Sequence, residues 1–350
     1  MPLPLKTFAA LTRLHRKRLL PVPGKILMRK GQWVEPDDVV AQALLEPSHI
    51  TLDIALGLGV LEDEVEDYLQ VEVGSLVANQ DILAGPVGYA QRVVRSPTDG
   101  RIVWASAGKL TLQVSSQPED IKAELPGRVI DLIADQGVVI ELSGSLAQGV
   151  WGNGLVAYGK YLCLANEPEA ELYLSPADTH LAGSICVGGI CSQSGTLTVA
   201  QELGIGGLVL SGLEAGLFEA AARLPFPTVV LEGFGRYPLN PEVHQVFLAH
   251  SGREMALNAK PWDKYTGMRP EIIIPQYSEE TTLTAEVLGV IQPGQKVRVI
   301  SPQVYGVYGI LIDLPGIHKF PSGVLGLSAT VLLENGSEDI VPLANLEFTG

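Results

Sequence analysis

The sequence predicts a multidomain chain that is mainly β and contains one α/β part. The first observation is compositional: 38 Gly and 24 Pro occur in a chain of 350 residues that is 46% hydrophobic and only 18% charged. So many turn-forming residues in so apolar a chain favour many short strands over long helices. The second observation is a stretch that recurs in the N-terminal third. The third is an alternation of apolar runs and helical segments near the middle. The length leaves room for two or three domains.

The recurring stretch runs from Gly31 to Ala41 and again from Gly74 to Ala84. Both copies read G-x-x-V-x-x-x-D-h-h-A, where h is an apolar residue. Glycine tolerates the positive φ of a tight turn. Each copy therefore predicts a glycine turn, a short strand, a second turn at the aspartate and an apolar strand. Short strands in this order are typical of a small barrel.

Arg95-Ser-Pro-Thr-Asp-Gly100 follows the second copy and is a turn by composition. The repeat followed by S-P-x-D-G-x-I-V resembles the barrel-sandwich hybrid, or hammerhead, fold of biotinyl and lipoyl carrier domains and membrane-fusion adaptors. A second cycle that begins at Pro126-Gly-Arg-Val-Ile resembles the same kind of hairpin. The resemblance implies a β domain of this type over residues 21–166.

Carrier domains of this kind present a modifiable lysine at the tip of a hairpin. The matching turn, Pro97-Thr-Asp-Gly100, contains no lysine, and Lys109 stands in a Gly-Lys-Leu setting that lacks the carrier pattern. We therefore expect no covalent biotin or lipoate, and no cofactor. The resemblance predicts a fold and not an activity.

Residues 172–258 predict a small parallel α/β domain. Short apolar runs at 184–187, 207–210 and 227–231 are typical of strands that are buried on both faces. Segments of helical character lie between and after them, at 196–203, 213–223 and 241–250. This alternation indicates a parallel sheet with right-handed crossovers.

A ligand of such a sheet would bind beyond the carboxyl ends of its strands. The Glu232–Arg236 stretch is the most informative of these ends, because opposite charges there bracket two glycines. One reading is a polar-ligand site, and the other is an ion pair that stabilises a tight turn; we expect the structural role. The candidate ligand-binding residues are Gly188, Gly189, Ser211, Gly212, Glu232, Gly233, Gly235 and Arg236.

Residues 259–284 predict a linker, because they hold Pro261, Pro270 and the polar run Tyr277–Thr284. Residues 285–350 predict several short strands, with G-x-x-V-R-V-I followed by G-x-x-G-I-L about a dozen residues on. This pattern resembles the KOW-type SH3-like barrel of ribosomal proteins and transcription elongation factors. The block has no surplus of cations, so its charge does not favour RNA binding.

Residues 1–20 predict a basic helix or arm, because Leu5, Phe8, Leu11 and Leu14 approximate helical spacing. The first 30 residues contain eight basic side chains and no acid, so a chain of net charge −15 carries −23 on the remainder. Residues 31–350, which carry this negative charge, should repel nucleic acid. The candidate phosphate contacts in the arm are Arg13, Arg16, Lys17 and Arg18.

The sequence shows no hydrolase, P-loop, dinucleotide or zinc-protease motif. Its three cysteines, Cys163, Cys186 and Cys191, are expected to be structural thiols in a reducing compartment, and no metal site is expected. No apolar run is long enough to span a membrane, so we expect a cytoplasmic protein.

The leading hypothesis is a non-enzymatic scaffold that makes protein–protein contacts. One alternative is a nucleic-acid-associated factor that uses the KOW-like barrel and the basic arm. The other is a small-ligand sensor or enzyme at the strand ends of the α/β domain. The sequence leaves the partner and the oligomeric state open.

Overall fold

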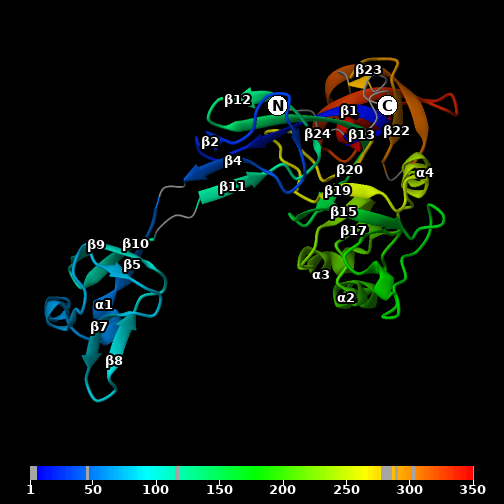
Figure 1. Cartoon of the computed structure of the whole chain (residues 1–350). Helices are drawn as coiled ribbons and strands as arrows, with labels where there is room; N and C mark the ends of the chain where they lie inside the picture. Colours follow the sequence, from blue (N-terminus) through cyan, green and yellow to red (C-terminus); the bar gives the residue numbers. More distant parts are fainter. Residues whose placement is uncertain are drawn as a thin grey trace.

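The computed structural model describes residues 6–44, 47–114, 118–276, 286–287, 291–301 and 304–349. The described chain is mainly β, as expected from its composition. Its strands form a large mixed sheet of 17 strands and smaller sheets of four, three and two strands (Figure 1).

The repeated stretch adopts the same structure twice. The first copy forms β3 (Trp33–Val34) and β4 (Val39–Leu44), and the second forms β6 (Leu76–Val77) and β7 (Ile82–Val87). The glycine that opens each copy has a positive φ, 88° at Gly31 and 99° at Gly74. The aspartate closes the second turn in both copies: Asp38 accepts a hydrogen bond from the Glu35 amide at 2.8 Å, and Asp81 from the Ala78 amide at 2.7 Å. The predicted turn–strand–turn–strand order is therefore present in each.

The duplication extends to whole four-stranded arrays. The first array has the order β3, β12 (Gly127–Ile133), β13 (Gly137–Gln148) and β1 (Lys6–Leu19). The second has the order β6, β9 (Gly100–Ser106), β10 (Lys109–Val114) and β5 (Ser48–Asp53). A Gly-Arg pair begins β12 and β9 alike. A Cβ on Gly127 or Gly100 would lie 2.5 Å from a carbonyl oxygen of the neighbouring strand, so both positions require glycine.

The second array is inserted between two paired strands, one that follows β3 and one that precedes β12 of the first array. β4 pairs with β2 (Lys25–Ile26) and with β11 (Pro118–Lys122), and the β4–β11 ribbon ends with Leu44 opposite Pro118. Residues 48–114, which we call the inserted unit, lie between these two ends. In the inserted unit, β7 pairs with β8 (Arg92–Arg95), and α1 (Ile54–Leu58) and the 3-10 turn η1 (Glu62–Tyr68) pack beside them.

The inserted unit has a core of its own, whose described members all lie between residues 52 and 112. Figure 1 shows it standing apart from the rest of the molecule, at the end of the β4–β11 ribbon. Residues 21–166, which the sequence predicts to be one β domain, thus contribute to more than one core. We call the described residues outside the inserted unit the body.

The basic N-terminal segment is a strand and not the predicted helix. β1 runs antiparallel to β13 from Phe8 to Leu19, with an irregularity between Ala9 and Thr12. Leu14 and Arg18 are buried on the face that the pleat presents to the core, while His15 and Lys17 are exposed. Pairing with a long neighbouring strand overrides a helical spacing of only four apolar residues.

The α/β part has the predicted parallel sheet. β15 (Val156–Cys163), β16 (Ile185–Val187), β17 (Gly207–Leu213) and β18 (Thr228–Phe234) are parallel neighbours in that order. β14 (Trp151–Gly152) adds to β18 and β19 (Glu254–Asn258) to β15, both antiparallel. Two apolar cores cover the sheet, and helical segments line it: α2 (Ser194–Leu203), α3 (Phe218–Ala222), α4 (Pro241–Ala249) and the 3-10 turns η2 (Thr179–Leu181) and η3 (Ala215–Leu217).

Part of the predicted linker is a buried strand. β20 (Glu271–Pro275) pairs with β13 and with β19, and so joins the first array to the α/β part. Its three consecutive isoleucines are each 1% exposed. Residues 277–284 of the predicted linker lie outside the described residues.

The C-terminal strands surround a compact apolar core. They are β21 (Glu286–Val287), β22 (Lys296–Val299), β23 (Tyr308–Lys319), β24 (Leu325–Leu333), β25 (Glu338–Pro342) and β26 (Leu346–Thr349), with the 3-10 turn η4 (Leu343–Asn345). β26 pairs with β22 and also runs parallel to the start of β1. The two ends of the described chain therefore meet in one sheet.

Candidate functional site

The predicted ligand-binding glycines lie at the carboxyl ends of the parallel strands, where the chain itself covers them. A Cβ on Gly189 would meet the carbonyl oxygen of Ala170, and one on Gly188 would lie 2.9 Å from the Leu172 side chain. Gly212 packs in the same way against the backbone of Gly235. These glycines allow close approach of neighbouring backbone.

The other members of the predicted set fall in different environments. Gly233 and Gly235 face the ring of Tyr237. Ser211 is fully buried in β17, and its hydroxyl has no hydrogen-bond partner among the described residues. None of the eight candidates lines the apolar cavity beside α4 or the open cleft beside β15.

Arg236 and Glu232, the two charges of the predicted turn, have different partners. Arg236 lies on the surface and pairs with Glu171 at 3.2 Å, and the hydroxyl of Ser192 donates to the same carboxylate. These contacts from Ser192 and Arg236 hold the pKa of Glu171 below its ordinary value. The expected ion pair between Glu232 and Arg236 is replaced by this exposed contact.

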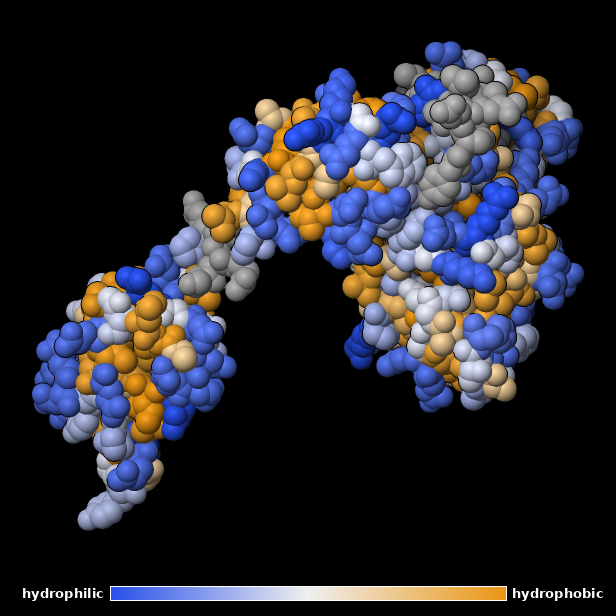
Figure 2. Space-filling model, viewed as in Figure 1, coloured by the Kyte–Doolittle hydropathy of each residue, from blue (hydrophilic) through white to orange (hydrophobic). Residues whose placement is uncertain are grey.

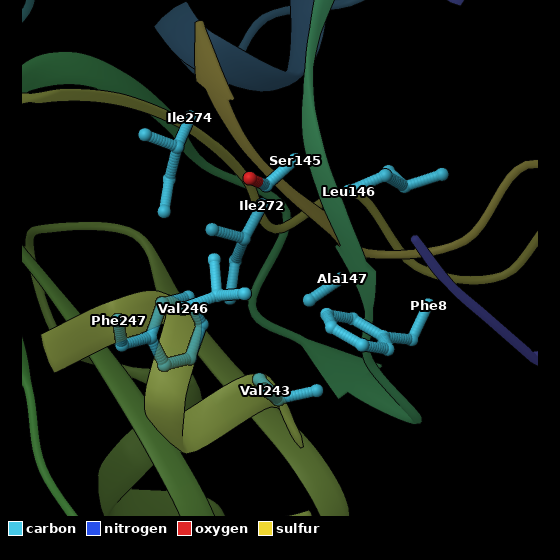
Figure 3. Close-up of a pocket in the computed structure, with 9 residues that line it drawn as sticks. All are labelled: Phe8, Ser145, Leu146, Ala147, Val243, Val246, Phe247, Ile272 and Ile274. Atoms are coloured by element: carbon cyan, nitrogen blue, oxygen red, sulfur yellow. The ribbon is translucent and has the colours of Figure 1, made fainter. Parts of the chain in front are cut away.

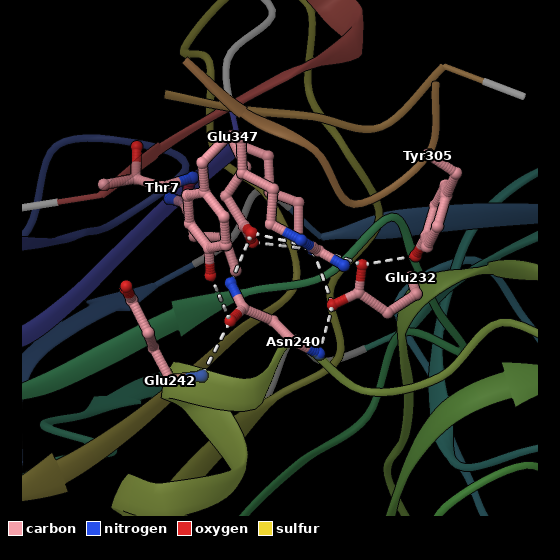
Figure 4. A network of polar contacts seen from close by, with 10 residues as sticks. Thr7, Glu232, Asn240, Glu242, Tyr305 and Glu347 are labelled. Carbon is pink, nitrogen blue, oxygen red and sulfur yellow. Dashed lines mark hydrogen bonds and ion pairs between the residues drawn. The ribbon is translucent and has the colours of Figure 1, made fainter. Parts of the chain in front are cut away.

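Glu232 belongs to a buried polar cluster, which Figure 4 shows from close by. Its carboxylate lies 2.9 Å from a guanidinium nitrogen of Arg298 and 3.3 Å from the Lys6 ammonium. The Tyr305 hydroxyl donates to it at 2.6 Å. Glu347 completes the cluster, 2.8 Å from Lys6 and 2.9 Å from Arg298.

Five different elements supply this buried polar cluster. Lys6 begins β1 and lies directly opposite Glu347 of β26, which fixes that pair by strand register. Glu232 comes from β18 and Arg298 from β22. Asn240, at the start of α4, donates to Glu347 at 2.7 Å and caps the helix through Glu242. The cluster thus ties the N-terminal strand, the α/β part and the C-terminal strands together.

The cluster holds two cations and two carboxylates, each with a side chain only 1–2% exposed. Burial alone would raise the pKa of Glu232, but Lys6 and Arg298 outweigh it and hold that pKa below its ordinary value. Burial and the neighbouring Glu232 carboxylate raise the pKa of Tyr305, which therefore stays a hydrogen-bond donor. The charges compensate one another, and the arrangement is that of a structural junction.

A small apolar cavity lies close to this junction, between α4, β13, β20 and the start of β1 (Figure 3). Phe8, Val243 and Ile272 are among the side chains that line it. It has no room for a water molecule, so it is a packing defect of the core and not a ligand site.

An open cleft of about 440 Å³ lies between the first repeat and β15 and β19. Four carboxylates line it, and two of them have a cation: Asp37 pairs with Lys122 at 2.9 Å and Glu124 with Lys260 at 3.1 Å. The Glu254 carboxylate instead accepts a hydrogen bond from the Tyr158 hydroxyl at 2.7 Å. The fourth is Glu35, which accepts from the indole of Trp33 at 2.9 Å.

The basic candidates on β1 are largely engaged within the protein. Arg16 forms a bidentate ion pair with Glu271 of β20: its Nε donates to one carboxylate oxygen at 2.7 Å and its Nη2 to the other at 2.6 Å. Arg18 is buried and contacts the Ala123 carbonyl and Glu124. Arg13 is half-buried, which leaves Lys17 as the exposed member of the four.

Large apolar side chains are exposed on the inserted unit. Leu76 is 74% exposed and Trp104 is 46% exposed, both on the outer face of its four-stranded sheet. Tyr89 is fully exposed in the β7–β8 turn. Figure 2 shows a broad apolar area on this unit, bordered by hydrophilic side chains. Such a patch is typical of an interaction surface.

The sequence could not identify the buried cluster, because its members lie between positions 6 and 347 and form no motif. The sequence did contain a signal that relates the sheet of the inserted unit to the sheet of the first array. The Gly-Arg pair at 100–101 and again at 127–128, read with the repeat, marks equivalent strands.

The cysteines are not placed for chemistry. All three are free, and burial raises the pKa of Cys186 to about 12 and that of Cys191 to about 11, so both are protonated thiols at neutral pH. Within the described ranges, no three His, Cys, Asp or Glu side chains converge as they would around a metal ion. Of the helices that the structure describes, none combines the length and apolarity needed to cross a membrane.

No protein-family model matches the chain, and a comparison with curated proteins finds no match.

Proposed function

We propose that the protein is a non-enzymatic scaffold whose inserted unit binds a protein partner. The observation that carries this proposal is the position of that unit. It is a second copy of a fold already present in the body, it has its own core, and it stands at the end of the two-stranded β4–β11 ribbon. A unit held in this way presents its surface to solvent on several sides.

The exposed side chains of the inserted unit support the same proposal. Trp104, Tyr89 and Arg101 are all exposed, and Trp, Tyr and Arg are the residues that most often dominate the energetics of protein interfaces. The unit also exposes Leu56 and Leu61 beside the acidic turn η1, at 81% and 67%. Apolar anchors with charged neighbours are the usual composition of an interface between proteins.

The body is the rigid part of the protein to which the inserted unit is attached. Burying charged side chains is costly unless opposite charges lie close by, and here each of two cations lies within 3.3 Å of both carboxylates. The parts of the body that this cluster joins should therefore unfold together in one cooperative transition.

The two alternatives have less support in the described contacts. The nucleic-acid proposal needs free cations on β1, but Arg16 and Arg18 contact carboxylates. The small-ligand proposal needs an open mouth at the parallel sheet, but residues 170–172 cover Gly188 and Gly189.

Excision of the inserted unit tests the proposal. Residues 45–117 are replaced by Asn-Gly, a two-residue turn suited to joining the paired ends Leu44 and Pro118. Both proteins serve as bait in lysate of the native host, with and without nuclease. We expect the full chain to retain a partner that the excised protein loses, and nuclease to have no effect. Equal capture by both baits, or capture that nuclease abolishes, would contradict the proposal.

A further inference from the structure

The two arrays share one exposed row of side chains, with one residue from each of four neighbouring strands. In the first array, the register places His15, Glu141, Arg128 and Trp33 side by side; we call this the body row. In the second array, it places His49, Gln113, Arg101 and Leu76 side by side; we call this the unit row. Both rows therefore read histidine, Glu or Gln, arginine, and a large apolar residue.

The two rows also have the same pattern of exposed and half-buried side chains. In each, the histidine, the arginine and the apolar residue are exposed, and the Glu or Gln is half-buried. Trp33 is 45% exposed and Leu76 is 74% exposed. The similarity therefore concerns the surface that each sheet presents and not its core.

The neighbouring row on the same face carries different side chains in the two arrays. It contains Lys17, Val139 and Asp131 in the first array, but Thr51, Thr111 and Trp104 in the second. The two arrays thus differ in this row, whereas the body row and the unit row carry similar side chains. A requirement of the fold would not distinguish two adjacent exposed rows.

The arginines of the two rows are available to a ligand. Neither Arg128 nor Arg101 forms an ion pair with another described residue, although the chain as a whole carries a net charge of −15. A planar guanidinium pairs with a carboxylate through two parallel hydrogen bonds. Each row adds an imidazole on one side and an apolar side chain on the other.

We propose that both rows bind one class of ligand: a segment of a partner protein that carries a carboxylate next to an apolar side chain. The carboxylate pairs with the arginine, and the apolar side chain packs against Trp33 or Leu76. This inference rests on the proposed function and names the surface and the partner chemistry. Charge complementarity selects an acidic segment, because the arginine is the unpaired charge of each row.

The two rows are expected to differ in affinity. In the body row, His15 lies 2.8 Å from Glu141, so the row contains a carboxylate of its own. In the unit row, the neutral Gln113 takes that place. Repulsion of an acidic ligand is therefore weaker at the unit row, which should bind it more tightly.

A labelled peptide tests the inference on the full chain. The probe is fluorescein-Leu-Glu-Leu-Glu-Leu-Glu, measured by fluorescence anisotropy at low and at physiological salt. We expect two unequal sites. Arg101→Ala should weaken the tighter site and Arg128→Ala the weaker one, each by about tenfold. Glu141→Gln should tighten the weaker site, a gain that a misfolded variant cannot produce.

Two controls accompany this titration. Arg223→Ala removes an arginine that is exposed elsewhere, on α3, where it pairs with Glu219, and should leave both sites unchanged. The peptide with Gln in place of Glu and an amidated C-terminus, which has no backbone or side-chain carboxylate, should bind neither row. Absence of binding, binding that Arg101→Ala and Arg128→Ala leave intact, or equal binding of the Gln peptide would overturn the inference.

The lysate capture is repeated with the Arg101→Ala/Arg128→Ala double variant, so that the two proposals can fail separately. Loss of the partner from both the double variant and the excised protein supports both proposals. If the excised protein loses the partner and the double variant retains it, the rows are not the binding surface, but the proposed function stands. If the excised protein retains the partner, the proposed function fails whatever the peptide shows.

Discussion

Four charged side chains that are distant in sequence neutralise one another inside this protein. Lys6 and Arg298 each contact both Glu232 and Glu347, so removal of any one member leaves an unbalanced charge away from water. Such a loss costs far more than the net contribution of the intact pair, because a buried charge without a partner keeps its desolvation penalty. These contacts determine both how much Glu232 contributes to stability and the direction in which its pKa is shifted.

We expect Glu232→Ala to lower the free energy of unfolding by roughly 3–5 kcal/mol, because Lys6 and Arg298 lose a shared counter-ion. Urea unfolding, compared at equal m-values, measures the change. Glu242→Ala is the matched control. Glu242 forms an exposed pair with Lys296 at 2.7 Å, and its loss should cost at most ~1 kcal/mol. Similar effects of the two substitutions would contradict the structural role of Glu232.

The same residue predicts a pH dependence. Burial opposes ionisation of Glu232, but Lys6 and Arg298 outweigh it and hold its pKa in the folded protein below the ordinary value. A carboxyl group of this kind stabilises the fold above its unfolded pKa of ~4.3 and loses that contribution as the pH falls through the lower folded value. We expect stability to fall below pH ~4 more steeply in the wild type than in Glu232→Gln. Parallel curves for the two proteins would show that Glu232 does not titrate in this way.

At the scale of elements, the repeat was predicted correctly from the sequence and β1 was not. The repeat predicted its turns and strands because Gly31, Asp38 and their counterparts act locally. The helix predicted for residues 1–20 is wrong over the described part, because β1 takes its conformation from β13, more than a hundred residues away. Pairing over so long a separation leaves no local signal, and the buried polar cluster escaped prediction for the same reason.

Glycine substitutions test the equivalence of the two arrays. Gly100→Ala and Gly127→Ala should both destabilise, because the added Cβ would lie 2.5 Å from the carbonyl oxygen of Gln113 or Glu141. Gly195→Ala, on α2, is the contrasting control, since a Cβ there meets nothing within 4 Å and alanine favours a helix by up to ~1 kcal/mol. Thermal unfolding distinguishes the two directions. A tolerated alanine at either array position would mean that the close strand approach is not required there.

The whole molecule consists of the body and the inserted unit. The inserted unit repeats the four-stranded array of the body and lies between the paired strands β4 and β11. The inserted unit and the body have separate cores, so each should keep its stability without the other. We expect replacement of residues 45–117 by Asn-Gly to leave the main unfolding transition of the body unchanged. Differential scanning calorimetry on the full and excised proteins checks this. A large loss of stability in the excised protein would show that the unit is part of the body's cooperative core.

The proposed function requires that the inserted unit binds the protein partner. Once a partner has been captured and purified, the direct measurement is its dissociation constant for the full chain and for the excised protein, with the melting temperature of each recorded in parallel. We expect the partner to bind the full chain and to bind a folded excised protein at least ~tenfold more weakly. Equal affinity for the two proteins would contradict it.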